Sequence, residues 1–312
     1  GYEPATTAAV AEAFDPSQAN IDRRTQRLAF GDLKVALLPK RNRGSTVHVQ
    51  TRFRWGDEKS LFGRMLAGEM AGSMLARGTS KMTRQQIADE MTRLQMTGGL
   101  LGFQTTREHL PDALRLLAHV MKEASIPADE YAQLQGQVAT GLAAQLDNPE
   151  ALSRDAMSSH FNTYPPGDPR HYMPLAERIA AVPKLPLDAV RAYHRDFYGT
   201  ARGEVAVVGD FDAEPVAALV KDLFTGFESR APFARVDREY REVRPARIVL
   251  DTPDKENAVI SARVDFPLRD DDPDAPALTL ANEIFGGGAG LSNRLIERLR
   301  QKDGLSYGAG TG

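Results

Sequence analysis

Residues 61–79 read LFGRMLAGEMAGSMLARGT, and this stretch predicts the helix from which the rest of the fold can be worked out. On a helical projection one side of it is largely apolar, because residues three and four positions apart share a face. The residues of that side are Phe62, Met65, Leu66, Glu69 and Ser73. The pattern therefore puts Glu69 in an otherwise apolar stripe, either as a buried acid or as one that faces a cleft.

Bulk composition excludes several classes of protein. The chain has 312 residues, 42% hydrophobic and 26% charged, which is enough for two cores in a soluble globular protein. A net charge of -3, with basic residues dispersed among acids, gives no reason to expect nucleic acid or an anionic membrane as partner. No apolar run approaches the roughly 18 residues of a membrane helix. The lack of cysteine excludes disulfides, thiolate metal sites and a cysteine nucleophile.

The N-terminal residues 1–25 are predicted to form an extended leader rather than a helix. Their start, GYEPATTAAVAEAF, lacks the basic residues and the apolar core of a signal peptide. The first residue is Gly rather than Met, so we expect that an upstream piece was removed.

Residues 26–230 carry the patterns of one complete domain. The stretch VHVQTRFRW, residues 47–55, alternates apolar and polar side chains and predicts a half-buried strand with a basic outer face. Thr83 and Gln86 predict a capping box at the start of a helix. Further helices are expected at about 111–124, 128–146, 149–161, 174–181, 187–198 and 213–224.

Residues 231–246 are charged and interrupted by proline, which is typical of a linker between domains. The strand and helix patterns then start again in residues 247–312. They predict strands at RIVLD (247–251) and AVISARVDF (258–266), a helix at about 275–285, and a last strand in GLSYGAGTG (304–312). This order matches that of the first domain, so we expect a tandem duplication whose second, homologous domain is truncated.

Counted back from Gly78-Thr79, the frame EMAGSMLARGT resembles the zinc-binding helix of the pitrilysin/insulinase family of metallopeptidases. The family motif H-x-x-E-H uses two histidines for zinc and its glutamate as general base on the zinc-bound water. Here Glu69 and Ser73 stand at the histidine positions and Gly72 at the glutamate. We therefore expect no metal site and no catalysis in this chain alone, with Glu69 as a weak residual metal ligand as the alternative.

The second metal-binding element of the family has lost its ligand as well. The resemblance implies a third ligand, a glutamate, on a helix just before Asp-Asn-Pro. In QVATGLAAQLDNP, residues 137–149, the Asp-Asn-Pro remains but no acid precedes it. The resemblance covers nearly the whole chain and includes GDEKS (56–60), YHRDFY (193–198), EVAVVGDFD (204–212) and, most specifically, FGGGAGLSNRLIERLRQKDGLSY (285–307).

The last of these stretches contains the candidate substrate-binding residues. In the family's inactive half an R-x6-Y element presents an arginine and a tyrosine to substrate held at the zinc of the other half. The resemblance assigns these roles to Arg300 on a helix end and Tyr307 on an adjoining strand. Both side chains can donate hydrogen bonds to a peptide carbonyl or a developing oxyanion. The alternative is that Arg300 lies on the surface and Tyr307 packs.

The resemblance implies an α+β fold in each domain, with a mostly antiparallel sheet covered by helices. Two such halves close like a clamshell around a chamber in which peptides are cut. The expected function is that of the non-catalytic half, which forms chamber wall and positions peptide for a zinc-bearing partner half. That partner is either fused upstream or a separate subunit. Long bacterial members imply a periplasmic location. The alternative function is a structural core subunit with no role in proteolysis.

Two other motifs give weaker signals. Gly286-Gly287-Gly288 before Ser292 could form a phosphate cradle, but no Gly-Lys-Ser/Thr follows, and a tight turn is favoured. His119 and Glu123 are four residues apart on an expected helix, a spacing typical of a solvated face when no third ligand is near.

Overall fold

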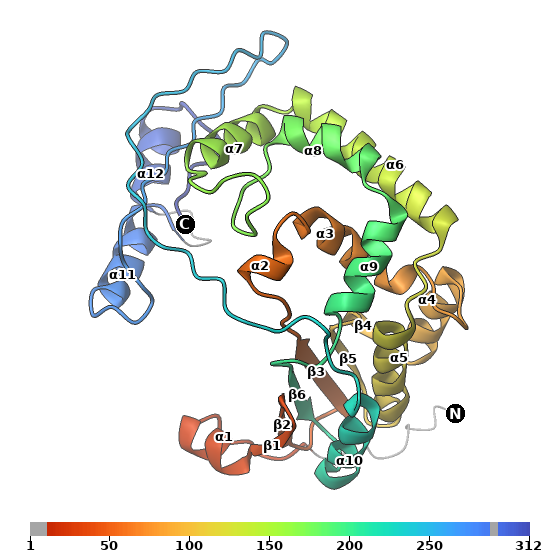
Figure 1. Ribbon diagram of the computed structural model, residues 1–312. Helices are drawn as coiled ribbons and strands as arrows, with labels where there is room; N and C mark the ends of the chain where they lie inside the picture. Colours follow the sequence, from red (N-terminus) through yellow and green to blue (C-terminus); the bar gives the residue numbers. More distant parts are fainter. Residues whose placement is uncertain (1–10, 288–292) are drawn as a thin grey trace, which may run out of the picture. The chain divides into compact units, whose positions relative to one another are not determined.

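The computed structural model describes residues 11–287 and 293–312, which belong to two compact units. Unit 1 comprises residues up to 238 together with 246–261, and unit 2 comprises residues 239–245 and 262–312. The elements of unit 1 (Figure 1) are α1 (Gln18–Arg24), β1 (Gln26–Phe30), β2 (Leu33–Pro39), β3 (Thr46–Arg52), α2 (Glu58–Leu61), α3 (Met65–Met74), η1 (Leu75–Arg77), α4 (Arg84–Arg93), β4 (Thr97–Gly99), β5 (Gly102–Thr106), α5 (Leu110–Glu123), α6 (Ala128–Ala144), η2 (Gln145–Asp147), α7 (Pro149–His160), α8 (Leu175–Ala181), η3 (Val182–Lys184), α9 (Leu187–Phe197), β6 (Glu204–Gly209) and α10 (Ala213–Phe224). Those of unit 2 are α11 (Ala275–Phe285), α12 (Arg294–Ile296) and the π-helical turn η4 (Glu297–Lys302).

The sheet of unit 1 has six strands in the order β1-β2-β6-β3-β5-β4. Four of its five neighbouring pairs are antiparallel, and β2 with β6 is the parallel pair. Because β6 follows a long helical segment, it can enter the sheet between β2 and β3, where Val207 pairs with Leu37 and Val49. The expected α+β fold with a mostly antiparallel sheet is confirmed.

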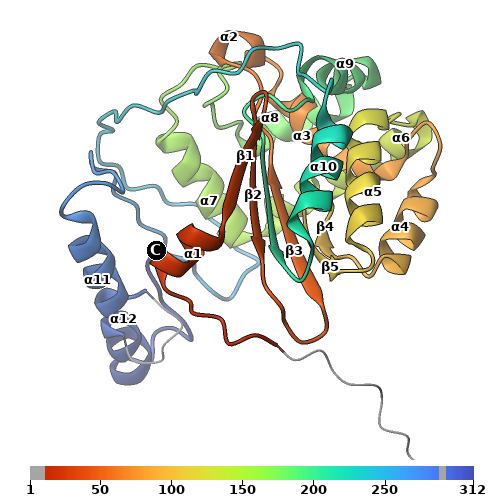
Figure 2. The same ribbon diagram turned by 90° about the horizontal axis from the view of Figure 1, so that it is seen from below.

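Alternation along the strands decides which face of the sheet is covered. In β3 Val47, Val49 and Thr51 are buried, whereas His48 and Gln50 are exposed. The buried face packs against α5 and α10, which Figure 2 shows along one side of the sheet. The predicted strand is thus correct in phase, although it ends at residue 52.

Helix α3 packs through a different face from the one predicted. Its buried residues are Ala67, Met70, Ala71 and Met74. On the side that the sequence suggested as buried, Phe62 is 55% exposed and Met65 44%. The helix carries apolar residues nearly all round, and its small residues allow α9 to approach the opposite face. Of the two alternatives for Glu69, the buried acid is wrong, because its side chain is 51% exposed, whereas the cleft-facing alternative agrees with the structure.

The extended-leader prediction is wrong for residues 18–24, which form the helix α1. Ser17 caps this helix by accepting a hydrogen bond from the Asn20 backbone nitrogen at 3.4 Å. Arg24 in its last turn pairs with Glu12 at 2.8 Å. Local capping therefore outweighs the weak periodicity on which the leader was predicted.

The strands predicted at 247–251, 258–266 and 304–312 do not form in the described residues, whereas the helix at 275–285 does. A strand needs a hydrogen-bonded neighbour, and none of the described strands pairs with these segments. Their apolar side chains, such as Val249 and Ile260, are exposed. The linker at 231–246 and the duplicated second domain stay predictions.

Within the described ranges, no helix combines the length and the apolar character needed to cross a membrane.

Candidate functional site

The three degenerate ligand positions lie on the open side of α3. The Glu69 Oε1 atom accepts a hydrogen bond from Arg178 Nη2 of α8 at 2.5 Å. The Ser73 hydroxyl donates to the Glu69 carbonyl oxygen at 3.1 Å. A Cβ atom at Gly72 would lie 3.7 Å from the Tyr198 hydroxyl. The Glu69 carboxylate, which the resemblance places at the first histidine position, is therefore bound to a guanidinium group.

The helix expected to carry the third ligand lies beside α3. Leu66 of α3 packs with Leu142 of α6 in a small apolar cluster. Gln137 Oε1 accepts a hydrogen bond from Arg77 Nη2 at 3.2 Å, and Arg77 also pairs with Glu130 at 3.1 Å. No group of three or more His, Asp or Glu side chains that could hold a metal occurs in the part of the chain that the structure describes.

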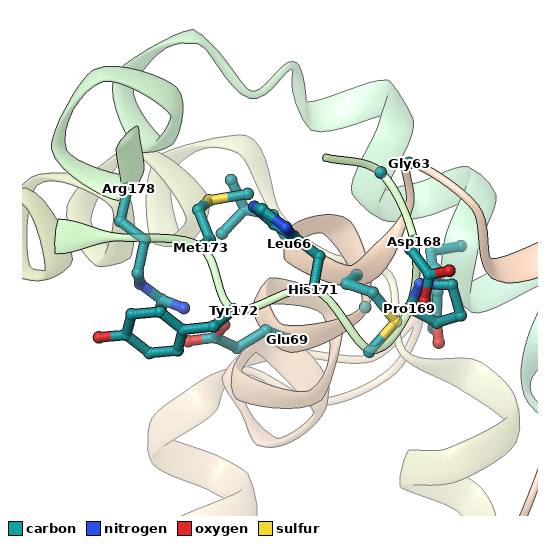
Figure 3. A pocket seen from close by; sticks show the side chains of 13 residues that line it. Gly63, Leu66, Glu69, Asp168, Pro169, His171, Tyr172, Met173 and Arg178 are labelled. Atoms are coloured by element: carbon teal, nitrogen blue, oxygen red, sulfur yellow. The ribbon is translucent and has the colours of Figure 1, made fainter. Parts of the chain in front are cut away.

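A cavity of about 380 Å³ opens over this side of α3 (Figure 3). Its apolar lining comes from Met65 and Leu66 of α3, Met173 of the loop before α8, and Tyr193 of α9. Three segments of the chain thus meet here, and all of them belong to unit 1. Its volume is within the range of small-molecule and side-chain pockets.

The charged side chains of the cavity lie in ion pairs. Figure 3 shows Arg178 reaching toward Glu69 beside the ring of Tyr172. The Asp168 carboxylate accepts from Arg170 Nε at 2.9 Å and Nη2 at 2.8 Å. These bonds raise the pKa of Arg170, so it stays charged. The cavity therefore presents paired charges rather than a net excess of one sign.

His171 is a buried member of the lining. Its Nδ1 lies 2.8 Å from the Tyr164 carbonyl oxygen. Because a carbonyl oxygen only accepts, Nδ1 carries a proton and donates. The Nε2 atom is buried, has no hydrogen-bond partner among the described residues, and lies 3.6 Å from Glu177 Oε2. The His171 side chain therefore stabilises the loop of residues 164–174 by its hydrogen bond to the Tyr164 backbone.

Aromatic side chains form the back of the cavity. Tyr193 lines the cavity and stacks on Phe197 with ring centroids 4.3 Å apart. Trp55 stacks in turn on Tyr198 at 4.4 Å. Burial raises the pKa of both tyrosines, so both phenols are neutral near pH 7. Gly68 makes room for this cluster, since a Cβ there would lie 2.5 Å from Tyr193 Cζ.

Arg300 and Tyr307 lie together in unit 2. The Arg300 guanidinium carbon lies 4.8 Å from the centroid of the Tyr307 ring, a cation–π contact. Tyr307 is 89% exposed. Arg300 belongs to the π-helical turn η4 rather than to an α-helix end, and Tyr307 does not lie on a strand, which corrects both placements. The alternative that Tyr307 packs in a core does not hold in the described residues.

Of the two weaker motifs, the His119/Glu123 pair has a structural role. His119 Nε2 lies 2.9 Å from the Thr79 hydroxyl, and Glu123 accepts a hydrogen bond from Ser80 at 3.1 Å. These contacts fasten α5 to the end of the 61–79 stretch. Gly288 and Ser292 of the suggested cradle lie outside the described residues.

Sequence reasoning did not find the cavity over α3. Its outer wall comes from the loop YPPGDPRHYMP, residues 164–174, which looked like a plain proline-rich connection. The available signal was Glu69 itself, a carboxylate beside apolar residues that needed a cationic partner. That partner, Arg178, is more than 100 residues away along the chain, at |i−j| = 109.

Comparison with known sequences identifies a family model described as "Peptidase M16 inactive domain", which matches residues 184–312. An uncharacterized zinc protease of Mycobacterium tuberculosis is 27% identical over 248 residues, which cover 75% of this chain and 54% of the relative. One of Mycobacterium leprae is 28% identical over 251 residues, with 75% and 53% covered. The chain thus spans about half the length of the curated relatives it matches.

Solved structures share the fold. A peptidase M16 inactive domain from Pseudomonas fluorescens superposes with a TM-score of 0.70 at 21% identity, covering 91% of this chain and 69% of that one. A protease from Helicobacter pylori gives 0.68 at 17% identity, with 92% and 71% covered. The periplasmic protease PqqL from Escherichia coli gives 0.53 at 13% identity, with 74% and 26% covered.

Proposed function

We propose that this chain is an inactive half of an M16-type zinc peptidase and that it positions peptide substrate for a zinc-bearing partner half. The partner half, fused upstream or present as a separate subunit, supplies zinc, its ligands and the general base. This half supplies chamber wall and hydrogen-bond donors. The polar open face of the sheet, with His48 and Gln50 exposed on β3, is suited to line a wet chamber.

The observation that carries the proposal is the contact between Arg300 and Tyr307. The Arg300 guanidinium carbon lies 4.8 Å from the centroid of the Tyr307 ring, and Tyr307 is 89% exposed, so a peptide can reach this pair of donors. A guanidinium and a phenol can together donate to a carbonyl oxygen whose charge grows in the transition state. Neither group needs a metal of its own in this chain.

The turn that carries Arg300 is built with defined contacts. Asn293 is buried and caps α12 by accepting from the Ile296 backbone nitrogen at 2.8 Å. Arg298 pairs with Asp303 at 2.8 Å across the turn. These bonds limit the positions open to the Arg300 side chain, which supports a positioning role.

Peptidase assays on the complex of this chain with its catalytic half test the proposal. Arg300→Ala and Tyr307→Phe should each lower kcat/KM, because each removes a donor aimed at the developing charge. The loss should be at most about 2 to 4 kcal/mol, the range for one oxyanion donor. The zinc content of the complex should stay unchanged.

Matched controls come from exposed residues of the same unit. Arg269→Ala and Tyr240→Phe remove the same functional groups from exposed positions elsewhere and should keep the wild-type rate. Wild-type rates in both Arg300→Ala and Tyr307→Phe would refute the positioning role and favour a structural core subunit. By likeness to the periplasmic PqqL we also propose a periplasmic location, which cell fractionation tests.

A further inference from the structure

We propose that the cavity over α3 binds an apolar side chain of a peptide, at the place where metal ligands would stand in a catalytic half. The inference rests on the proposed function, because it takes the ligand to be a peptide. It assigns a binding role to Glu69 and Arg178, which the family resemblance leaves without one.

The shape and lining of the cavity fit an apolar side chain. Met65, Met173 and Tyr193 surround it, and flexible thioethers adapt to side chains of different shape. Met65 of the lining is 44% exposed, and Phe62, next to the lining residue Gly167, is 55% exposed, so each could bury apolar area by covering a ligand. Phe62 is held in place by Gly167, where a Cβ would lie 2.7 Å from the Phe62 ring.

The charges of the cavity argue for a neutral ligand. Glu69 is bound to Arg178, and Asp168 is bound to Arg170. A charged ligand would have to break one of these pairs or remain without a partner in a partly desolvated site, and both cost free energy. A neutral apolar side chain meets neither penalty.

The ion pair at the mouth can also bind a peptide backbone. Only one carboxylate oxygen of Glu69 takes part in the short contact with Arg178, and the Glu69 side chain is 51% exposed. The pair therefore presents an acceptor and remaining guanidinium donors next to each other. A peptide group offers the complementary N–H and C=O at similar spacing, so the backbone can bind here while its side chain enters the cavity.

The chain contains a built-in reporter for this site. Trp55 is its single tryptophan, and its ring stacks at 4.4 Å on Tyr198, in the same aromatic cluster as Tyr193, which lines the cavity. A ligand that contacts Tyr193 changes the surroundings of this indole. Binding should therefore alter the intrinsic fluorescence of the full chain.

The test is a titration of the 312-residue chain with blocked tetrapeptides of alanine in which one residue is leucine or aspartate, followed by fluorescence and by calorimetry. We expect saturable binding of the leucine peptide and binding at least about tenfold weaker for the aspartate peptide. Met65→Gln should weaken leucine-peptide binding. Leu146→Gln, which changes an exposed apolar residue outside the cavity, is the matched control and should bind as wild type.

Glu69→Gln tests the charge argument separately. It leaves the Arg178 guanidinium without its carboxylate, so the aspartate peptide should gain affinity relative to the leucine peptide. Equal binding of the two peptides to the wild type, equal effects of Met65→Gln and Leu146→Gln, or no binding by calorimetry would each overturn the proposal. The titration needs neither partner half nor zinc, so its failure leaves the test of Arg300 and Tyr307 intact.

Discussion

His194 is a partly buried imidazole beside the aromatic cluster. Its Nε2 lies 2.9 Å from the Met121 carbonyl oxygen, which can only accept, so Nε2 donates. The ring lies 4.6 Å from that of Tyr198, centroid to centroid. Burial lowers the pKa of His194 below its ordinary value, and the Met121 hydrogen bond opposes this only in part. The folded protein therefore holds His194 neutral at a pH where the unfolded chain begins to protonate it.

This difference predicts a loss of stability in mild acid. As the pH falls below about 6.5, the unfolded chain takes up a proton at His194 before the folded chain does, so the free energy of unfolding decreases. The contribution cannot exceed about 1.4 kcal/mol per pH unit. Urea unfolding at pH 7.5 and 5.5 should show a smaller difference for His194→Gln than for wild type. His48→Gln, at an exposed position on β3, should keep the wild-type difference.

At the scale of an element, local chemistry was predictable and packing was not. The Thr83/Gln86 capping box forms as predicted, with hydrogen bonds of 3.3 and 2.8 Å, because every atom it needs lies within four residues. The buried face of α3 was missed, because apolar residues occur on both of its sides. That choice depends on Tyr193 and Arg178, which come more than 100 residues later.

Two glycine substitutions in helices should therefore change the free energy of unfolding in opposite directions. Gly68→Ala places a Cβ 2.5 Å from Tyr193 Cζ and should destabilise the fold by about 1 to 3 kcal/mol through overpacking. Gly136→Ala in α6 meets nothing within 4 Å and should stabilise it by about 0.5 to 1 kcal/mol through helix propensity. Urea unfolding measures both. If both substitutions changed the free energy of unfolding in the same direction, the close contact of α3 and α9 would be contradicted.

At the scale of the whole molecule, the sheet order was beyond the reach of sequence patterns. Alternation predicted β3 as a strand, but only tertiary pairing inserts β6 between β2 and β3. The candidate site likewise has one part that the sequence suggested and one part that it did not. The family resemblance suggested Arg300 and Tyr307, which lie within one short segment. The cavity over α3 joins three distant segments and has no local pattern.

The segment between α10 and α11 should be the first target of limited proteolysis. It contains no described helix or strand, and Arg238, Arg241 and Arg247 are exposed. Trypsin should cut there before it cuts in residues 26–224, whose chain is held in the sheet and helices. Mass spectrometry of the early fragments should find a resistant N-terminal piece ending near 238 to 247. A dominant first cut between residues 26 and 224 would contradict this.

Arg178 also determines how hard it would be for evolution to return this half to catalysis. Restoring the family motif at Glu69, Gly72 and Ser73 would take away the partner of Arg178 and leave its guanidinium beside two new imidazoles. A fixed positive charge at that distance repels a divalent cation and opposes zinc binding. A change on α8 would have to accompany those on α3, and replacing Glu69 or Arg178 alone leaves a charge without its partner. The Glu69–Arg178 ion pair thus opposes the restoration of a zinc site on α3.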